Sequence, residues 1–283
     1  MPNAVIVDAV RTPGGKRNGK LSGWHPADLS AEVLKALVER NNLDPELIDD
    51  VIMGCVMQVG DQGLNIGRNA VLAAGFPESV PATTIDRQCG SSQQSAHFAA
   101  QGVIAGAYDI VVAAGVEVMS TTPMGASVTP GSMPFGPAMM ARYAKVGGLV
   151  PQGISAEMIA DKWALSREDL DGYGARSQQL AEQATKEGRF ERELLPVKSK
   201  LRDRETGNIV ESGEMVTADE GIRPGTTLET LGKLKPAFKP DGKVTAGNSS
   251  QITDGAAAML IMSEEKAAQL GLKPRARFVQ FAL

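Results

Sequence analysis

The chain has 283 residues, 42% of them hydrophobic and 22% charged, which is enough for one large domain or two ordinary ones with a sizeable core. A net charge of −4, no lysine/arginine run and only 4% aromatic residues exclude an extended nucleic-acid-binding surface. Two cysteines and two histidines are too few for a disulfide scaffold or for a zinc site at ordinary spacing. No apolar segment reaches about 18 residues and no leader peptide is evident, so we expect a soluble, cytoplasmic protein.

The first 120 residues alternate between strand-like and helix-like segments. The apolar residues of PADLSAEVLKALVER fall on one helical face, and the glycines at 75 and 106 mark the ends of two further helices. Near-continuous apolar strands in a βαβαβ order predict a mostly parallel sheet covered by helices on both faces. We expect strands at 4–10, 51–57, 82–86 and 110–118, helices at 26–40, 65–74 and 91–105, and a helix start at Asp44-Pro45.

After residue 119 the pattern changes and later returns. Residues 120–152 are rich in Gly, Pro, Met and Ser and predict a long loop. Residues 189–245 are polar, with turn signals at 206–208 and 241–242. An α/β domain is therefore interrupted by a long insertion. Besides these segments we expect a helix near 155–163, a capping box at 166–169 that opens a helix to about 188, strands at 256–262 and 276–283, and a helix at 264–270 that Gly271 ends.

One strand-to-helix junction carries a candidate nucleophile. The stretch TTIDRQCGSSQQSAHF ends a strand, presents Cys89 in a sharp turn and begins a helix at once. Unpaired N–H groups and the positive end of the helix dipole favour a thiolate at such a place, and the thiolate is the nucleophile. The N–H of Cys89 could also donate to an oxyanion on an attached acyl group. From spacing alone, a small buried residue at a strand end explains Cys89 equally well.

Five ordered segments together resemble the thiolases, the coenzyme-A-dependent enzymes that cleave or form 3-ketoacyl-CoA. Each segment alone is a weak signal, but their order and their spread over essentially the whole chain make the resemblance specific. The segments are VDAVRTPGGK (7–16), GCVMQVGDQGLNIGRNA (54–70), RQCGSSQQSAHFAAQ (87–101), AGVEVMS (114–120) and AGNSSQITDGAAA (246–258).

The resemblance implies the thiolase fold, an α/β fold with a mixed, mostly parallel sheet layered with helices. This chain would hold the N-terminal half with an inserted loop domain. Residues 1–120 would begin the N-terminal domain, 121–245 would form the inserted CoA-binding loop domain, 246–272 would return to the first domain, and 273–283 would start a C-terminal domain. The family also implies a homodimer or homotetramer, without membrane insertion and without a nucleic-acid partner.

The chemistry implied is a ping-pong thiolytic cleavage of 3-ketoacyl-CoA, or the reverse Claisen condensation, in the β-oxidation of fatty acids or steroid side chains. Cys89 would attack the 3-keto carbon, keep the acyl group on sulfur and pass it to free CoA. Coenzyme A is then a co-substrate, and no metal takes part.

The resemblance also assigns CoA contacts. Pro151-Gln152 replaces the His-Met that short-chain acetoacetyl-CoA thiolases carry, which argues against a narrow acetoacetyl specificity. Without the family, Arg223 is a solvated charge and Ser250 a turn residue. The matching positions are Gln152 for the nucleotide end or pantetheine, Arg223 with Pro224 and Gly225 near the adenine and phosphates, Ser250 for a pantetheine amide, and Phe238 and Ala246 for the pocket wall.

The remaining candidates have structural interpretations. We expect Cys55 to be a core residue in its strand, His25 to stand at a helix entry, and Asp254 to stabilise a turn. His97 follows Cys89 by eight positions, a rise of about 12 Å along a helix, so it is too distant to be the base and is structural or close to a subunit interface.

The second half of the family fold supplies an Asn-Glu-Ala-Phe motif, a Gly-His-Pro histidine and a second cysteine in a glycine-rich loop, and none of these motifs occurs in this sequence. In the family that histidine activates the nucleophile and the second cysteine moves a proton at the α-carbon. We therefore expect the 283-residue chain alone to have little or no turnover.

Two other functions compete with a thiolase. A ketoacyl synthase also places a cysteine at a strand–helix turn, but the AGNSSQITDG motif and the long loop domain favour a thiolase. A non-catalytic CoA- or lipid-binding or assembly module of thiolase-like fold fits the missing motifs, whereas Cys89 argues against it.

Overall fold

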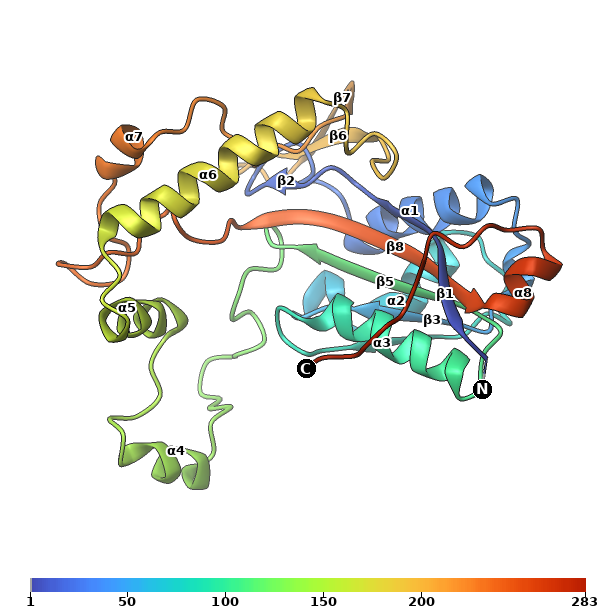
Figure 1. Cartoon of the computed structure of the whole chain (residues 1–283), viewed down its shortest axis with the longest axis horizontal. Coiled ribbons are helices and arrows are strands. Elements are labelled where there is room, and N and C mark those ends of the chain that lie inside the picture. Colours follow the sequence, from blue (N-terminus) through green and yellow to red (C-terminus); the bar gives the residue numbers. More distant parts are fainter. Residues whose placement is uncertain (1) are drawn as a thin grey trace. The chain divides into compact units, whose positions relative to one another are not determined.

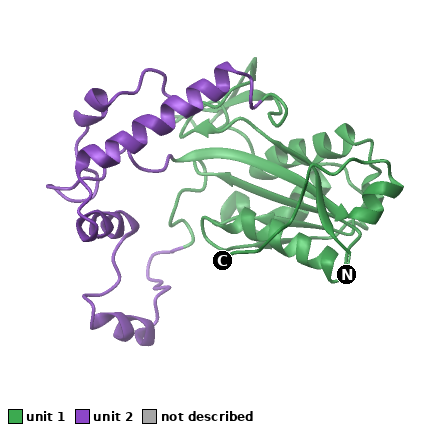
Figure 2. Cartoon of the chain, viewed as in Figure 1, with its two compact units in different colours: residues 1–127, 191–220, 252–283 green, residues 128–190, 221–251 purple. Residues whose placement is uncertain are grey.

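The computed structural model describes residues 2–283, which form two compact units. Unit 1 comprises the residues up to 127, together with 191–220 and 252–283, and unit 2 comprises 128–190 and 221–251 (Figure 2). No helix within residues 2–283 is long and apolar enough to cross a membrane.

Unit 1 is built on one mixed sheet with the strand order β4-β3-β5-β8-β1-β9, and the short β2 pairs with β8. β3 is parallel to β4 and β5, whereas β8 is antiparallel to both β5 and β1. Most strands therefore run in one direction, as the sequence predicts, with β8 and β9 running against them. The strands are β1 (Ala4–Arg11), β2 (Gly15–Lys16), β3 (Asp50–Gly54), β4 (Ala82–Ile85), β5 (Ile110–Val118), β8 (Thr253–Ser263) and β9 (Ala276–Arg277).

Helices cover both faces of this sheet (Figure 1). On one face, α1 (Pro26–Arg40) and α2 (Ile66–Ala73) pack in a core that contains Val112. On the other, α3 (Ser91–Ile104) packs in a smaller core with Val111. Neighbouring residues of β5 thus face opposite layers, and the strand is buried on both sides. The short elements η1 (Pro45–Leu47), η2 (Gly60–Gln62) and α8 (Glu264–Gln269) complete unit 1 apart from its hairpin.

The hairpin of β6 (Val197–Arg202) and β7 (Ile209–Val216) belongs to unit 1, so unit 2 does not coincide with the expected insertion at 121–245. Arg11 of β1 ties both flanks of the hairpin to the sheet. Its Nε is 2.7 Å from a Glu193 carboxylate oxygen, and its Nη1 and Nη2 donate to both oxygens of Asp219 at 2.7 and 3.0 Å. This bidentate pairing is the strongest geometry for an arginine and a carboxylate.

Unit 2 is helical. The long helix α6 opens with the predicted capping box, in which Ser166 and Asp169 bond to each other's backbone N–H. The helices of unit 2 are α4 (Pro137–Ala144), α5 (Gln152–Lys162), α6 (Arg167–Lys186) and α7 (Leu228–Gly232).

Two expected strands are shorter than predicted, and two segments contain elements that were not predicted. The strand predicted for 51–57 ends at Gly54, and the strand predicted for 276–283 is ordered as β9 over two residues only. The long loop at 120–152 contains α4, a short helix whose residues are all at least partly exposed. The polar stretch 189–245 contains the β6–β7 hairpin.

Two glycines bring the first turn of α3 against the sheet. Gly54, the last residue of β3, and Gly115 within β5 are register partners. A Cβ at Gly54 would overlap the backbone nitrogen of Ser92, and a Cβ at Gly115 would overlap its Oγ.

Gly115→Ala is therefore expected to lower the free energy of unfolding by roughly 1–3 kcal/mol through overpacking, measured by urea denaturation. Gly255→Ala in β8 is the matched control, because the nearest atom to its new Cβ would be the Thr12 Oγ1 at an ordinary 3.4 Å. Equal effects of the two substitutions would contradict the close packing of α3.

Candidate active site

Cys89 stands in a constrained turn between β4 and α3. The preceding residue, Gln88, has a φ of 47°, a left-handed conformation that is uncommon for a side chain other than glycine. Asp86 Oδ1 accepts the Gln88 N–H at 2.6 Å, and Ser91 Oγ donates to the Gln88 carbonyl at 2.6 Å while accepting the Arg87 N–H at 3.0 Å. Backbone strain of this kind persists where surrounding bonds over-determine it, and it gathers at functional sites.

The first turn of α3 is fixed on the sheet by a second set of contacts. Ser95 Oγ lies 2.7 Å from the Ser92 carbonyl and 3.0 Å from the Ala114 carbonyl of β5. Together with the close approach at Gly54 and Gly115, these bonds set the position from which the Cys89 turn projects.

The two cysteines have opposite environments. Cys89 is exposed, so the interpretation of it as a small buried residue was wrong. Cys55 is buried as predicted, although it lies beyond the end of β3. Burial, reinforced by the carboxylates of Glu117 and Asp86, raises the pKa of the Cys55 thiol to about 12. Its Sγ accepts from Gln62 Nε2 at 3.4 Å, in a buried network that also includes Glu117. Of the two thiols, only that of Cys89 is therefore accessible from solvent.

Neither histidine is placed as a base for Cys89. His25 is the N-cap of α1, as predicted, and its Nδ1 accepts the Ala27 N–H at 3.3 Å. His97 lies on α3, 8% exposed, with its ring edge-to-face against Phe281 at a centroid distance of 5.3 Å. Asp254 holds a turn: its carboxylate accepts the N–H and the Oγ–H of Ser120 at 2.8 and 2.6 Å.

The predicted CoA contacts lie in unit 2. Arg223 is exposed; its N–H donates to Gln178 Oε1 of α6 at 2.8 Å, and its Nη1 donates to the Gly221 carbonyl at 3.3 Å. Gly225 has a φ of 75°, and its N–H donates to Glu182 Oε2 at 3.3 Å. The loop that holds Arg223, Pro224 and Gly225 is therefore fastened to one side of α6.

Of the other two predicted contacts, Ser250 adjoins this loop and Gln152 lies at the start of α5. Gln251 Nε2 donates to the Gly221 carbonyl at 2.8 Å, which places the exposed Ser250 next to the Arg223 loop. Gln152 is the first residue of α5 and is also exposed. The next residue, Gly153, packs so closely on the Phe238 ring that a Cβ there would overlap it. Unit 2 thus holds all five predicted CoA residues, while Cys89 belongs to unit 1.

Comparison with known proteins identifies the chain. A family model described as the N-terminal domain of thiolase matches residues 4–265. The chain is 46% identical over its whole length to a 3-ketoacyl-CoA thiolase of Pseudoalteromonas translucida, of which it covers 70%. It is 45% identical to a 3-ketoacyl-CoA thiolase of Saccharophagus degradans, of which it covers 69%. The chain belongs to the thiolase family.

The fold agrees with this assignment. A crystal structure of the Bacillus anthracis acetyl-CoA acetyltransferase matches with a TM-score of 0.82 and 36% identity, over 99% of this chain and 70% of that one. The predicted thiolase fold is therefore confirmed, and the chain is an acyltransferase of the thiolase type.

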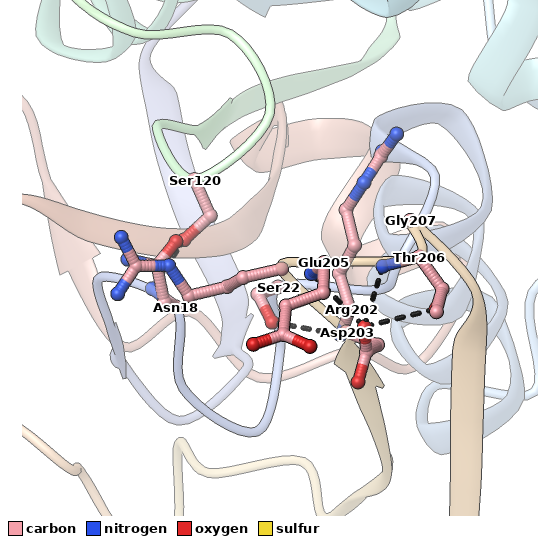
Figure 3. A pocket seen from close by; sticks show the side chains of 9 residues that line it. Asn18, Ser22, Ser120, Arg202, Asp203, Glu205, Thr206 and Gly207 are labelled. Carbon is pink, nitrogen blue, oxygen red and sulfur yellow. Dashed lines mark hydrogen bonds between the residues drawn. The ribbon is translucent and has the colours of Figure 1, made fainter.

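Neither a metal site nor the hollow at the β6–β7 turn competes with the Cys89 turn within residues 2–283 of this thiolase-family chain. Within residues 2–283, no group of three His, Cys, Asp or Glu side chains is arranged to hold a metal ion. A hollow of about 470 Å³ lies at the β6–β7 turn (Figure 3). The positive charges of Arg202 and Arg204 are offset by the negative charges of Asp203 and Glu205. The Asp203 carboxylate accepts the N–H groups of Glu205 and Thr206, so it stabilises the turn itself.

Sequence reasoning missed the residues that hold the site together. Asp86 and Ser91 lie inside the stretch TTIDRQCGSSQQSAHF that presents Cys89, so its short polar residues were an available signal. Gln178 and Glu182 contact residues 45 and 43 positions away, and nothing in their own helix indicates that role.

At about pH 8, iodoacetamide is expected to label Cys89 and spare Cys55. Only a thiolate reacts, and the Cys55 thiolate forms only as the pH approaches its pKa of about 12. Peptide mass spectrometry gives the extent of labelling at each cysteine.

Cys55→Ala is the matched control and should keep full labelling, whereas Cys89→Ser should lose it. Comparable labelling of both cysteines in the folded wild-type chain would show that Cys55 is not buried as described.

Proposed function

We propose that this chain carries the acyl-accepting site of a 3-ketoacyl-CoA thiolase and that Cys89 is its nucleophile. The observation that carries the proposal is an exposed cysteine in a tightly bonded, strained turn at the start of α3, in a chain of the thiolase family. The names of its relatives support the substrate class.

The reaction follows from covalent catalysis. Cys89 Sγ attacks the 3-keto carbon, and the bond between the α-carbon and that carbon breaks. The α-carbon leaves as the acetyl-CoA enolate and takes up a proton, while the acyl group stays on sulfur as a thioester. The thiol of free CoA then attacks the thioester and regenerates Cys89.

We assign the CoA co-substrate to unit 2. Arg223 supplies a positive charge for the phosphates, and Pro224 and Gly225 offer backbone groups beside it. Ser250 is exposed next to this loop, where its hydroxyl can bond to a pantetheine amide, and Gln152 is exposed at the start of α5. The exposure of these residues and the fastening of their loop by α6 support the assignment.

The substrate range is proposed from the same residues. Pro151-Gln152 stands where acetoacetyl-CoA thiolases carry His-Met, which favours bulkier acyl chains, those of fatty acids or of steroid side chains in β-oxidation. Self-association into a homodimer or homotetramer and a cytoplasmic location stay predictions.

A second candidate is a CoA-binding module that does not turn over. The observation in its favour is that neither histidine is placed beside Cys89. The two candidates differ in one measurable event, the transfer of an acyl group to sulfur.

Incubation with acetyl-CoA or acetoacetyl-CoA is expected to add one acyl group to the wild-type chain, measured as intact mass. The adduct should be absent from Cys89→Ala and unchanged in Cys55→Ala, since Cys55 is buried and protonated. Absence of an adduct from the wild-type chain, with CoA binding still detected by calorimetry, would reject Cys89 as acyl acceptor here and leave the binding module.

A further inference from the structure

Unit 2 contains two buried carboxylates to which neither the acyl transfer nor the CoA contacts assign a role. Glu157 of α5 is 1% exposed and Asp171 of α6 is 2% exposed. A buried carboxylate is costly unless it is fully hydrogen-bonded, so its partners show what its position serves. Both side chains are bonded to one short segment, residues 242–248.

Glu157 holds the first part of this segment. Its Oε2 accepts the Lys243 N–H and its Oε1 accepts the Val244 N–H, each at 2.9 Å. Gly242 packs so tightly against this carboxylate that a Cβ would overlap Oε1. One side chain thus satisfies two consecutive backbone donors, which fixes both the position and the direction of the segment.

Asp171 holds the second part through Asn248. Asp171 Oδ1 accepts from Asn248 Nδ2 at 2.8 Å, and Asp171 Oδ2 is paired with Arg167 Nε at 2.7 Å. Asn248 closes the segment on itself, since its Nδ2 also donates to the Lys243 carbonyl at 3.1 Å and its Oδ1 accepts the Thr245 N–H at 2.8 Å.

We propose that Glu157 and Asp171 are positioning residues for coenzyme A: they fix segment 242–248 and thereby set the place of Ser250. The inference rests on the proposed function, because it takes Ser250 as a contact of the pantetheine. Ser250 follows Asn248 by two residues, and Gln251 joins the same stretch to the Arg223 loop. Loss of either carboxylate leaves buried donors unpaired and lets the segment move.

The test compares CoA affinity, by isothermal titration calorimetry, among the wild-type chain, Glu157→Gln, Asp171→Asn and Glu229→Gln. Glu229 is the matched control, an exposed carboxylate of the same unit whose ion-pair partner, Lys233, lies outside segment 242–248. We expect the two buried-site variants to weaken CoA binding at least about ten-fold and the control to change it little.

Two further measurements separate positioning from general instability. Hydrogen exchange of the Lys243 and Val244 amides should accelerate in Glu157→Gln, while the iodoacetamide labelling rate of Cys89 in unit 1 stays at the wild-type value. Should Glu157→Gln fail to fold, Asn248→Ala removes the link to Asp171 while the ion pair of Asp171 with Arg167 stays in place, and it is expected to give the same loss of affinity.

The outcomes are distinct. Wild-type affinity in the folded buried-site variants would overturn the positioning role while leaving the CoA site intact. A wild-type chain that does not bind CoA would overturn the assignment of CoA to unit 2, and the positioning role with it.

Discussion

The sheet of unit 1 depends on β8, which lies beside β5 in the sheet but follows unit 2 in the sequence. β8 pairs with β5 from Ile110↔Met262 to Val118↔Asp254, and on its other edge it pairs with β1. Without β8, the parallel strands β4, β3 and β5 would have no link to β1. The end of β5 and the start of β8 are register partners, and the Asp254 carboxylate closes this junction by accepting two hydrogen bonds from Ser120. Burial raises the pKa of Asp254, and the bonds from Ser120 oppose that shift.

Much of unit 1 could be predicted because its elements are buried on defined faces. The helix at 26–40 and the strand at 110–118 have the expected bounds, and Gly75 and Gly106 have the positive φ of 75° that a helix end requires. Local pattern and tertiary burial agree in these elements, so each reinforces the other.

The β6–β7 hairpin and α4 were not predicted, because β7 and α4 bury few or none of their residues. Seven of the eight residues of β7 are exposed, so the alternation that marks a half-buried strand is missing. Contacts between residues far apart in the sequence join the hairpin to the rest of unit 1. Trp24 Nε1 donates to the Lys198 carbonyl, and Arg11 has partners 182 and 208 residues away. A bond across that separation leaves no periodic trace in the sequence.

The residues of the candidate site also differ in how far the sequence predicts them. Cys89 could be selected as the candidate nucleophile because strand, turn and helix follow one another within a few residues that match a family motif. The carboxylate that holds the left-handed Gln88 is only two residues away in the sequence, whereas the clamps on residues 242–248 depend on side chains that meet only in three dimensions. The motif AGNSSQITDG drew attention to Ser250, but its Asn248 is the residue that fastens the segment to α6.

The facing pair Gly54 and Gly115 has a consequence for how this sequence can vary. At most positions of the sheet an apolar residue can be exchanged for another of similar volume, because the core has some capacity to repack. At these two positions the required feature is an empty space, and no exchange of side chains can reproduce it. A deep mutational scan of unit 1 would thus show Gly54 and Gly115 as intolerant sites, although neither residue has a side chain. The distance between α3 and the sheet is therefore maintained by the absence of a Cβ at these two positions.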